Sequence, residues 1–296
     1  MEETRALLQV AVVQMVSTLR VDENLRQAEA LVAAAARAGA DVVVLPEYWP
    51  IIHHERAARL AVRERPGKGP LQEAMRCWAA HHGIWLIGGT IPLEAEEPTK
   101  MRNSCLVYDR QGNERARYDK IHLFRFARAS ERYDEAEEIE PGEDPVVVSI
   151  DGWRVGLAIC YDLRFPELFR QMALLDAFVL PAAFTYTTGQ THWEVLLRAR
   201  AIENLCYGAA SAQGGRHESG RRTWGRSMII DPWGEVQAAF GEGVGWVMAF
   251  WRKERLAEVR QELPVHKLRN LWHSSEPGGM PCKCNTSATA SGGSTG

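Results

Sequence analysis

The chain alternates between short apolar runs and longer amphipathic stretches. Several apolar runs are rich in β-branched residues, which predicts strands buried on both faces: LLQVAVVQM (7–15), DVVVLPE (41–47), IWLIGGT (84–90) and AFVLPAAF (177–184). Other stretches predict helices, over 24–38, 70–82 and 166–176. Buried strands that alternate with helices predict an α/β protein whose helices cover its sheets.

The remaining segments extend this pattern within one domain. A hairpin is expected over 103–120, two strands around Asp151-Gly152, and a helix over 191–204 with a capping box of Thr191 and Glu194. Later elements are strands in CYGAASAQ (206–213), SMIIDPWGEV (227–236) and VGWVMAF (244–250), and a helix in RKERLAEVRQEL (252–263). No long linker interrupts the chain, so one domain is expected over 1–273. Residues 274–296 are mostly Gly, Ser, Thr and Pro, which predicts a mobile tail.

Composition narrows the class of protein. Of the 296 residues, 46% are hydrophobic and 25% are charged, and the formal net charge of −3 leaves no basic surplus for nucleic acid. No apolar run approaches the ~20 residues of a membrane span, and the N-terminus lacks the pattern of a signal peptide. Six scattered cysteines do not imply disulfides without a secretory signal. The sequence therefore predicts a cytoplasmic protein, without nucleic-acid or membrane partners, in which Cys160 can act as a thiolate.

Cys160 stands where an apolar strand ends. In LAICYDLRFPEL (157–168) the strand stops at this cysteine, and Pro166 begins a helix. A strand, sharp turn and helix form a nucleophile elbow, which projects the side chain from the carboxyl end of a sheet. The backbone N–H groups that follow can then face a developing oxyanion. An ordinary buried core cysteine is the alternative.

Two charged residues also end predicted strands. Glu47 follows DVVVLP, and Lys120 ends RARYDK. Either one alone is typical of a solvent-facing charge. Together with Cys160 they offer a base, a cation and a nucleophile, which are the groups that covalent catalysis requires.

The motifs PEY (46–48), YDKIHLF (118–124) and ICYDLRFPE (159–167) resemble the nitrilase superfamily of carbon–nitrogen hydrolases. The resemblance runs from AVVQM at 11 to DPWGEV at 231–236 and includes TTGQTHWEVLLRARAIEN (187–204). It implies a single-domain, four-layer α-β-β-α sandwich that forms a homodimer or larger homo-oligomer. It also implies a catalytic triad without metal or cofactor, which falls on Glu47, Lys120 and Cys160.

The resemblance assigns a role to each of these residues. Cys160 attacks an amide carbon, Glu47 transfers protons, and Lys120 stabilises the oxyanion together with the backbone N–H of Tyr161. A second glutamate supports the lysine. Its position falls on Glu135, although three other acidic residues are close in sequence: Glu131, Glu137 and Glu138.

The substrate is indicated by a finer resemblance. CYDLRFPEL and AASAQGGRHESGRRTWGRS (209–227) look most like the deaminated-glutathione amidase branch, which cleaves the amide between a 2-oxoglutaryl group and Cys-Gly. The neighbouring ω-amidase branch, which hydrolyses 2-oxoglutaramate, is the alternative. A non-catalytic scaffold is disfavoured because all three triad residues are present. A papain-type peptidase is disfavoured because no histidine ends a comparable strand.

Both substrates carry carboxylates, which arginine can bind as a bidentate fork. Arg164 lies four residues after the nucleophile and is expected to bind the carboxylate near the 2-oxo group, unless it holds the elbow through an internal ion pair. The loop GGRHESGRRTWGR (214–226) carries Arg216, Arg221, Arg222 and Arg226, of which Arg216 and Arg222 are expected to reach the distant carboxylate of deaminated glutathione. The alternative for these two is a solvated basic loop.

Overall fold

The computed structural model describes residues 4–128 and 131–268, which form two sheets between layers of helices. Strands of the seven-stranded sheet run in the order β17-β1-β2-β3-β5-β4, with β6 paired to β5. Their bounds are β1 (Leu7–Gln14), β2 (Val42–Val44), β3 (Trp85–Ile87), β4 (Ile91–Glu94), β5 (Met101–Tyr108), β6 (Glu114–Asp119) and β17 (Gly245–Arg252).

The second sheet has six strands in the order β16-β15-β12-β11-β10-β9. Their bounds are β9 (Val146–Ile150), β10 (Trp153–Leu157), β11 (Ala177–Ala182), β12 (Tyr207–Ala212), β15 (Met228–Ile230) and β16 (Val236–Ala239). Two small hairpins lie outside the sheets: β7 (Arg125–Arg128) with β8 (Glu131–Asp134), and β13 (Gly214–Arg216) with β14 (Arg222–Trp224).

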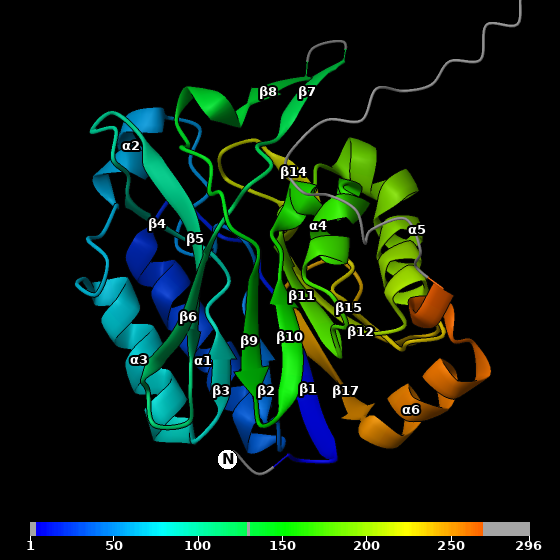
Figure 1. Cartoon of the computed structure of the whole chain (residues 1–296). Coiled ribbons are helices and arrows are strands. Elements are labelled where there is room, and N and C mark those ends of the chain that lie inside the picture. Colours follow the sequence, from blue (N-terminus) through cyan, green and yellow to red (C-terminus); the bar gives the residue numbers. More distant parts are fainter. Residues whose placement is uncertain (1–3, 129–130, 269–296) are drawn as a thin grey trace, which may run out of the picture.

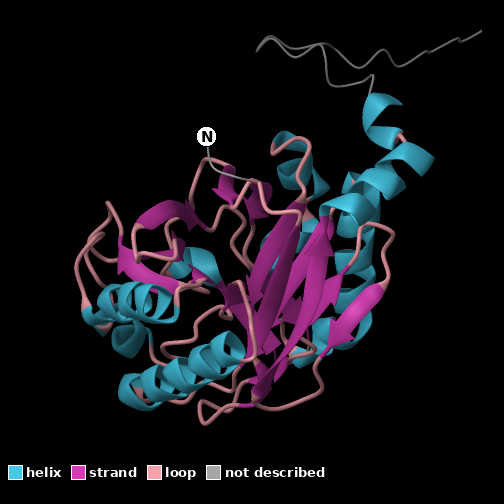
Figure 2. Ribbon diagram, turned by 90° about the horizontal axis from the view of Figure 1, so that it is seen from below, coloured by secondary structure: helices cyan, strands magenta, loops and turns pink. Residues whose placement is uncertain are grey.

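Helices cover the outer faces of both sheets, which makes the predicted α-β-β-α sandwich (Figure 1). On one side lie α1 (Val21–Arg37) and α3 (Pro70–His82), and on the other α4 (Pro166–Gln171) and α5 (Tyr186–Asn204). Figure 2 shows the same arrangement from below, with helices on both outer sides of the strands. The remaining α-helices are α2 (Arg56–Ala61) and α6 (Lys253–Glu262), and short 3₁₀ helices span Glu135–Glu137, Cys160–Arg164 and Val265–Leu268. None of the helices in the described ranges is long and apolar enough to cross a bilayer.

The strand β1 explains why these apolar runs are buried on both faces. Side chains alternate along a strand, so Leu8, Val10 and Val12 join the core between the sheets. Ala11 and Val13 point the other way and join the core beneath α1 and α3. The parallel neighbours β1, β2 and β3 end at one edge of their sheet, as do β10, β11 and β12 in the other. Glu47, which follows β2, and Cys160, which follows β10, belong to the site described below.

Three sequence predictions about local structure are wrong. The capping box at Thr191 is absent because α5 begins at Tyr186, where the Thr185 hydroxyl accepts a hydrogen bond from the Thr188 N–H. The single strand expected over 227–236 is β15 and β16, joined by a turn in which Asp231 accepts backbone hydrogen bonds. The helix expected over 166–176 ends at Gln171. The expected tail, 274–296, and the domain boundary at 273 lie outside the described residues.

Candidate active site

Cys160 lies on a strained turn between β10 and α4. Its φ of +48° is uncommon for a residue with a side chain and marks a backbone held in place by its surroundings. Buried Asp162 provides that support, because its carboxylate accepts hydrogen bonds from the Ile159 N–H at 2.8 Å and the Tyr118 hydroxyl at 2.7 Å. The other carboxylate oxygen lies 2.7 Å from Nδ1 of His122. Residues of the YDKIHLF segment therefore hold the elbow.

Lys120 lies between two carboxylates and is shielded from solvent. Its Nζ is 2.9 Å from Oε1 of Glu47 and 2.8 Å from Oε2 of Glu135. Lys120 and Glu47 are each 1% exposed. The structure thus brings together Glu47 after β2, Lys120 after β6 and Glu135 after β8. Glu138, one of the alternatives to Glu135, pairs instead with Arg59 at 2.6 Å.

Three donors orient the Glu47 carboxylate. Besides Lys120, the side-chain amide of Asn103 donates to Oε1 at 2.9 Å, and the backbone N–H of Ala183 donates to Oε2 at 2.8 Å. The sequence analysis overlooked Asn103 and Ala183. Asn103 is on β5 and Ala183 follows β11, so the carboxylate is held between residues of both sheets.

Tyr48 is a further residue that the sequence analysis overlooked. Its backbone has a φ of +55°, and its hydroxyl donates to Oε1 of Glu135 at 2.9 Å. The Phe124 N–H donates to the other oxygen of Glu135 at 2.7 Å. The sequence signal for Tyr48 is its position directly after Glu47, in the motif PEY.

The electrostatics of the site favour a charged lysine and a neutral thiol. Burial disfavours the charge on Lys120, but Glu135 and Glu47 outweigh it and raise the pKa of the lysine. Burial, and then the charge of Glu47, raises the pKa of the Cys160 thiol well above its usual value. A neutral thiol has to lose its proton to a base as it attacks.

A small hollow, about 10 Å³, adjoins Cys160 and has room for a group the size of a water molecule. Arg164 lines it, with its guanidinium 5.4 Å from the centre of the Phe184 ring and 5.7 Å from that of Tyr161. Its hydrogen-bond partner is Nδ1 of His192, at 3.2 Å. Among the described residues, no carboxylate pairs with Arg164, so the internal ion pair considered from the sequence is not formed.

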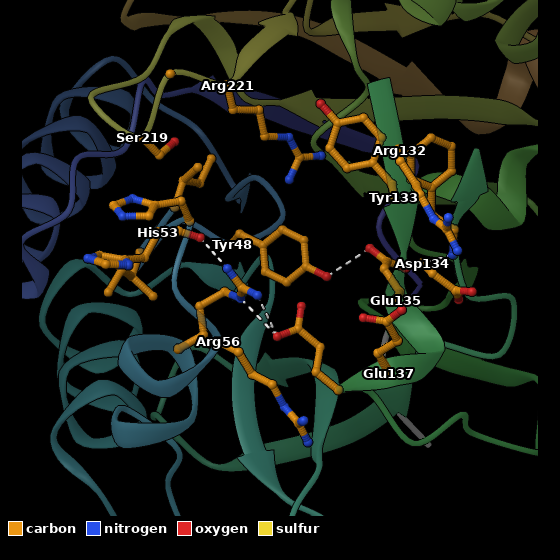
Figure 3. Close-up of a pocket in the computed structure, with 17 residues that line it drawn as sticks. Tyr48, His53, Arg56, Arg132, Tyr133, Asp134, Glu135, Glu137, Ser219 and Arg221 are labelled. Atoms are coloured by element: carbon orange, nitrogen blue, oxygen red, sulfur yellow. Dashed lines mark hydrogen bonds and ion pairs between the residues drawn. The ribbon is translucent and has the colours of Figure 1, made fainter. Parts of the chain in front are cut away.

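A larger hollow of about 490 Å³ opens beside the first (Figure 3). Phe124, Glu135 and Arg221 line both hollows. Arg216 and Arg222 line neither one: Arg216 is exposed, and Arg222 stacks 3.5 Å from the centre of the Tyr186 ring. The arginine that the structure brings to the thiol from this loop is therefore Arg221, rather than the two expected from the sequence.

Comparison with known proteins identifies the class of the fold and site. Nit3 of Saccharomyces cerevisiae, a member of branch 10 of the nitrilase superfamily, matches with a TM-score of 0.80 and 28% identity, over 90% of this chain and 98% of Nit3. The carbon–nitrogen hydrolase family model matches residues 9–261. The chain belongs to this family, and the predicted nitrilase-like sandwich and the predicted class of enzyme are confirmed.

Two relatives with named activities are more similar to this chain in sequence than Nit3 is. Deaminated glutathione amidase of Yersinia enterocolitica is 38% identical over 261 residues, which cover 86% of this chain and 91% of the relative. Omega-amidase NIT2 of Xenopus tropicalis is 34% identical over 267 residues, which cover 89% of this chain and 95% of the relative. These names match the two branches that the sequence analysis compared.

Proposed function

We propose that this carbon–nitrogen hydrolase cleaves deaminated glutathione to 2-oxoglutarate and Cys-Gly, with Cys160 as nucleophile. The observation that carries the proposal is the group of buried Glu47, buried Lys120 and partly buried Glu135 beside a thiol at a strained turn. The Yersinia relative's name supports the substrate. The scaffold alternative gives no reason to bury a lysine between two carboxylates next to a thiol.

In the first half of the reaction, sulfur of Cys160 bonds to the amide carbon while Glu47 takes the thiol proton. The raised pKa of the thiol makes this transfer to a base part of the attack. Lys120 stabilises the oxyanion together with the backbone N–H of Tyr161, which lies in the first turn after the elbow. Glu47 then gives its proton to the leaving nitrogen as the C–N bond breaks, which leaves a thioester.

In the second half, Glu47 takes a proton from a water molecule while the oxygen of that water bonds to the thioester carbon. The C–S bond breaks, 2-oxoglutarate leaves, and the thiolate regains the proton from Glu47. The three donors that hold the Glu47 carboxylate keep it in one place through both proton transfers. Glu135 does not transfer protons in this scheme and instead keeps Lys120 charged.

We assign the acyl part of the substrate to the side of the thiol where Arg164 lies. Its guanidinium lines the small hollow, and no described acidic residue neutralises it. Burial lowers the pKa of Arg164, although an arginine still remains charged at neutral pH. A substrate carboxylate beside Arg164 would replace the interactions with water that the guanidinium loses on burial.

The test is a panel of amides, with release of Cys-Gly and of ammonia measured in parallel. The proposal expects a higher kcat/KM for deaminated glutathione than for 2-oxoglutaramate, and little activity on amides without a 2-oxo acid. A preference for 2-oxoglutaramate would instead support the ω-amidase alternative, which the Xenopus relative's name favours. Activity on neither substrate would overturn the proposal.

We also propose that the enzyme is a cytoplasmic homodimer. Supporting the dimer, Val195 and Ile202 lie seven residues apart on one face of α5 and are 67% and 41% exposed. Trp233, 46% exposed, lies beside Gly234, where an added Cβ would meet Ile202 at 2.6 Å. Such apolar exposure is typical of a contact surface. Light scattering on the wild type and Val195→Glu tests it, with a monomeric variant expected.

A further inference from the structure

Arg221 occupies the junction between the two hollows. It lies between β13 and β14, directly before Arg222, and is partly buried. Figure 3 shows its side chain reaching from that loop toward Tyr48, with Tyr133 beside it. A group that extends from the thiol into the larger hollow therefore passes this guanidinium.

The guanidinium of Arg221 has hydrogen-bond donors that no described residue uses. Its Nη2 donates to the carbonyl of Ala183 at 2.8 Å, and it lies 5.5 Å from the centre of the Tyr133 ring. Its Nε is buried and has no hydrogen-bond partner among the described residues. No described carboxylate forms an ion pair with it, whereas Arg59, in the same hollow, is paired with Glu138. Arg221 is thus a cation with unused donors, held at the entrance to the thiol.

The loop that carries Arg221 is fixed before substrate arrives. His217 is 5% exposed and bridges two groups, with Nδ1 2.9 Å from the Ser17 carbonyl and Nε2 2.8 Å from the Thr223 hydroxyl. The contact to Ala183 adds a second anchor, and the N–H of that same residue donates to Glu47. A binding group fixed in this way loses little conformational entropy when a ligand arrives.

We propose that Arg221 is a specificity-determining residue that binds the terminal carboxylate of the leaving amine. This rests on the proposed function, in which that amine is Cys-Gly. An extended dipeptide places its carboxylate roughly 7 Å from the scissile bond, on the side of the larger hollow. Two other arginines line this hollow without a carboxylate partner in the described part of the chain, Arg56 and Arg132, and both are exposed to solvent. Ammonia, the leaving group of 2-oxoglutaramate, offers nothing for Arg221 to bind.

The experiment compares kcat/KM for three substrates: 2-oxoglutaryl-Cys-Gly, its glycinamide analogue and 2-oxoglutaramate. In the wild type, the free carboxylate should favour the first substrate over its glycinamide analogue. Arg221→Gln should lower this preference roughly 10- to 100-fold, as expected for a charge-assisted hydrogen bond. Arg222→Gln is the matched control, because this neighbour stacks on Tyr186 and lines neither hollow, and it should keep the wild-type preference.

The outcomes separate this inference from the proposed function. If the wild type hydrolyses deaminated glutathione but Arg221→Gln keeps its preference for the free carboxylate, Arg221 does not bind that group. An equal loss on all three substrates also overturns the inference, since it would mean that Arg221 contacts the shared acyl group or only stabilises the fold. A shift caused by Arg222→Gln instead would restore the assignment made from the sequence. Arg221→Lys, which keeps the charge, should retain part of the preference and provides a second variant if the first folds poorly.

Discussion

Nζ of Lys120 lies 2.9 Å from Oε1 of Glu47, and the side chains of both residues are 0–1% exposed. The same Nζ lies 2.8 Å from Oε2 of Glu135. A buried charge is tolerated when its partners neutralise it. The pair therefore connects two functions, because the same contact orients the proposed base and keeps the proposed oxyanion-binding cation charged.

Replacing Lys120 with methionine should damage both functions. We expect kcat/KM to fall at least ~10²–10³-fold, as for the loss of an oxyanion donor. The free energy of unfolding should also fall by about 3–5 kcal/mol, since buried Glu47 and partly buried Glu135 would both lose their cation. Steady-state kinetics and urea unfolding measure the two effects.

The matched control is Lys100→Met, which removes a surface ion pair with Glu97. It should cost less than about 1 kcal/mol. Wild-type turnover by Lys120→Met would contradict the role of the lysine. So would a borohydride-reduced adduct of substrate on Lys120, since a cation held by two carboxylates should not form a Schiff base.

The thiol of Cys160 should react slowly with iodoacetamide at neutral pH. Burial, and then the charge of Glu47, raises its pKa, so little thiolate forms at pH 7. The alkylation rate, followed by mass spectrometry of the Cys160 peptide, should still be rising above pH 9. Exposed Cys77 reports on the reagent in the same samples. A rate that levels off near pH 7 would indicate a resting thiolate and a different mechanism.

Arg164 should matter for both candidate substrates, because each has a carboxylate beside its 2-oxo group. Arg164→Gln is expected to lower kcat/KM roughly 10- to 100-fold on deaminated glutathione and on 2-oxoglutaramate alike. Arg164→Lys should recover only part of the loss, since it keeps the charge without the planar fork. A loss confined to deaminated glutathione would move Arg164 to the leaving-group side.

The elbow could be predicted from the sequence because its signals are local. An apolar run, a cysteine and a proline six residues later are enough to predict a strand, a turn and a helix. The support for that elbow could not be predicted in the same way. Asn103 and Ala183 reach Glu47 only because two sheets pack face to face, and nothing near either residue indicates this contact.

The sequence could not indicate which loop arginine lines the hollows, for a specific physical reason. Neighbouring residues along an extended segment point to opposite sides. Arg216 and Arg222 are paired across β13 and β14 and so share one side of the hairpin, whereas Arg221 lines the hollows. Because a shift of one residue reverses the direction of a side chain, a cluster of arginines in the sequence predicts a basic loop without indicating which arginine enters the site.

Stability should fall in acid because of His217. Burial lowers its pKa from 6.5 to about 4, so the folded protein favours the neutral imidazole. Its contribution is therefore complete above pH 6.5 and is lost as the pH falls toward 4, by about 3 kcal/mol in total. Urea unfolding between pH 7.5 and 4.5 should show this loss, and His217→Gln should flatten that part of the curve. Exposed His81→Gln is the control. The same slope in wild type and His217→Gln would assign the acid sensitivity to other groups.

The central claim is that Cys160 forms a covalent thioester with the acyl group. Rapid quenching of the wild type with deaminated glutathione, followed by peptide mass spectrometry, tests it most directly. The account predicts a 2-oxoglutaryl group on the Cys160 peptide during turnover. It also predicts neither adduct nor turnover in Cys160→Ala, whose thermal unfolding should remain close to that of the wild type. Turnover by Cys160→Ala, or an acyl group on a different residue, would contradict the account.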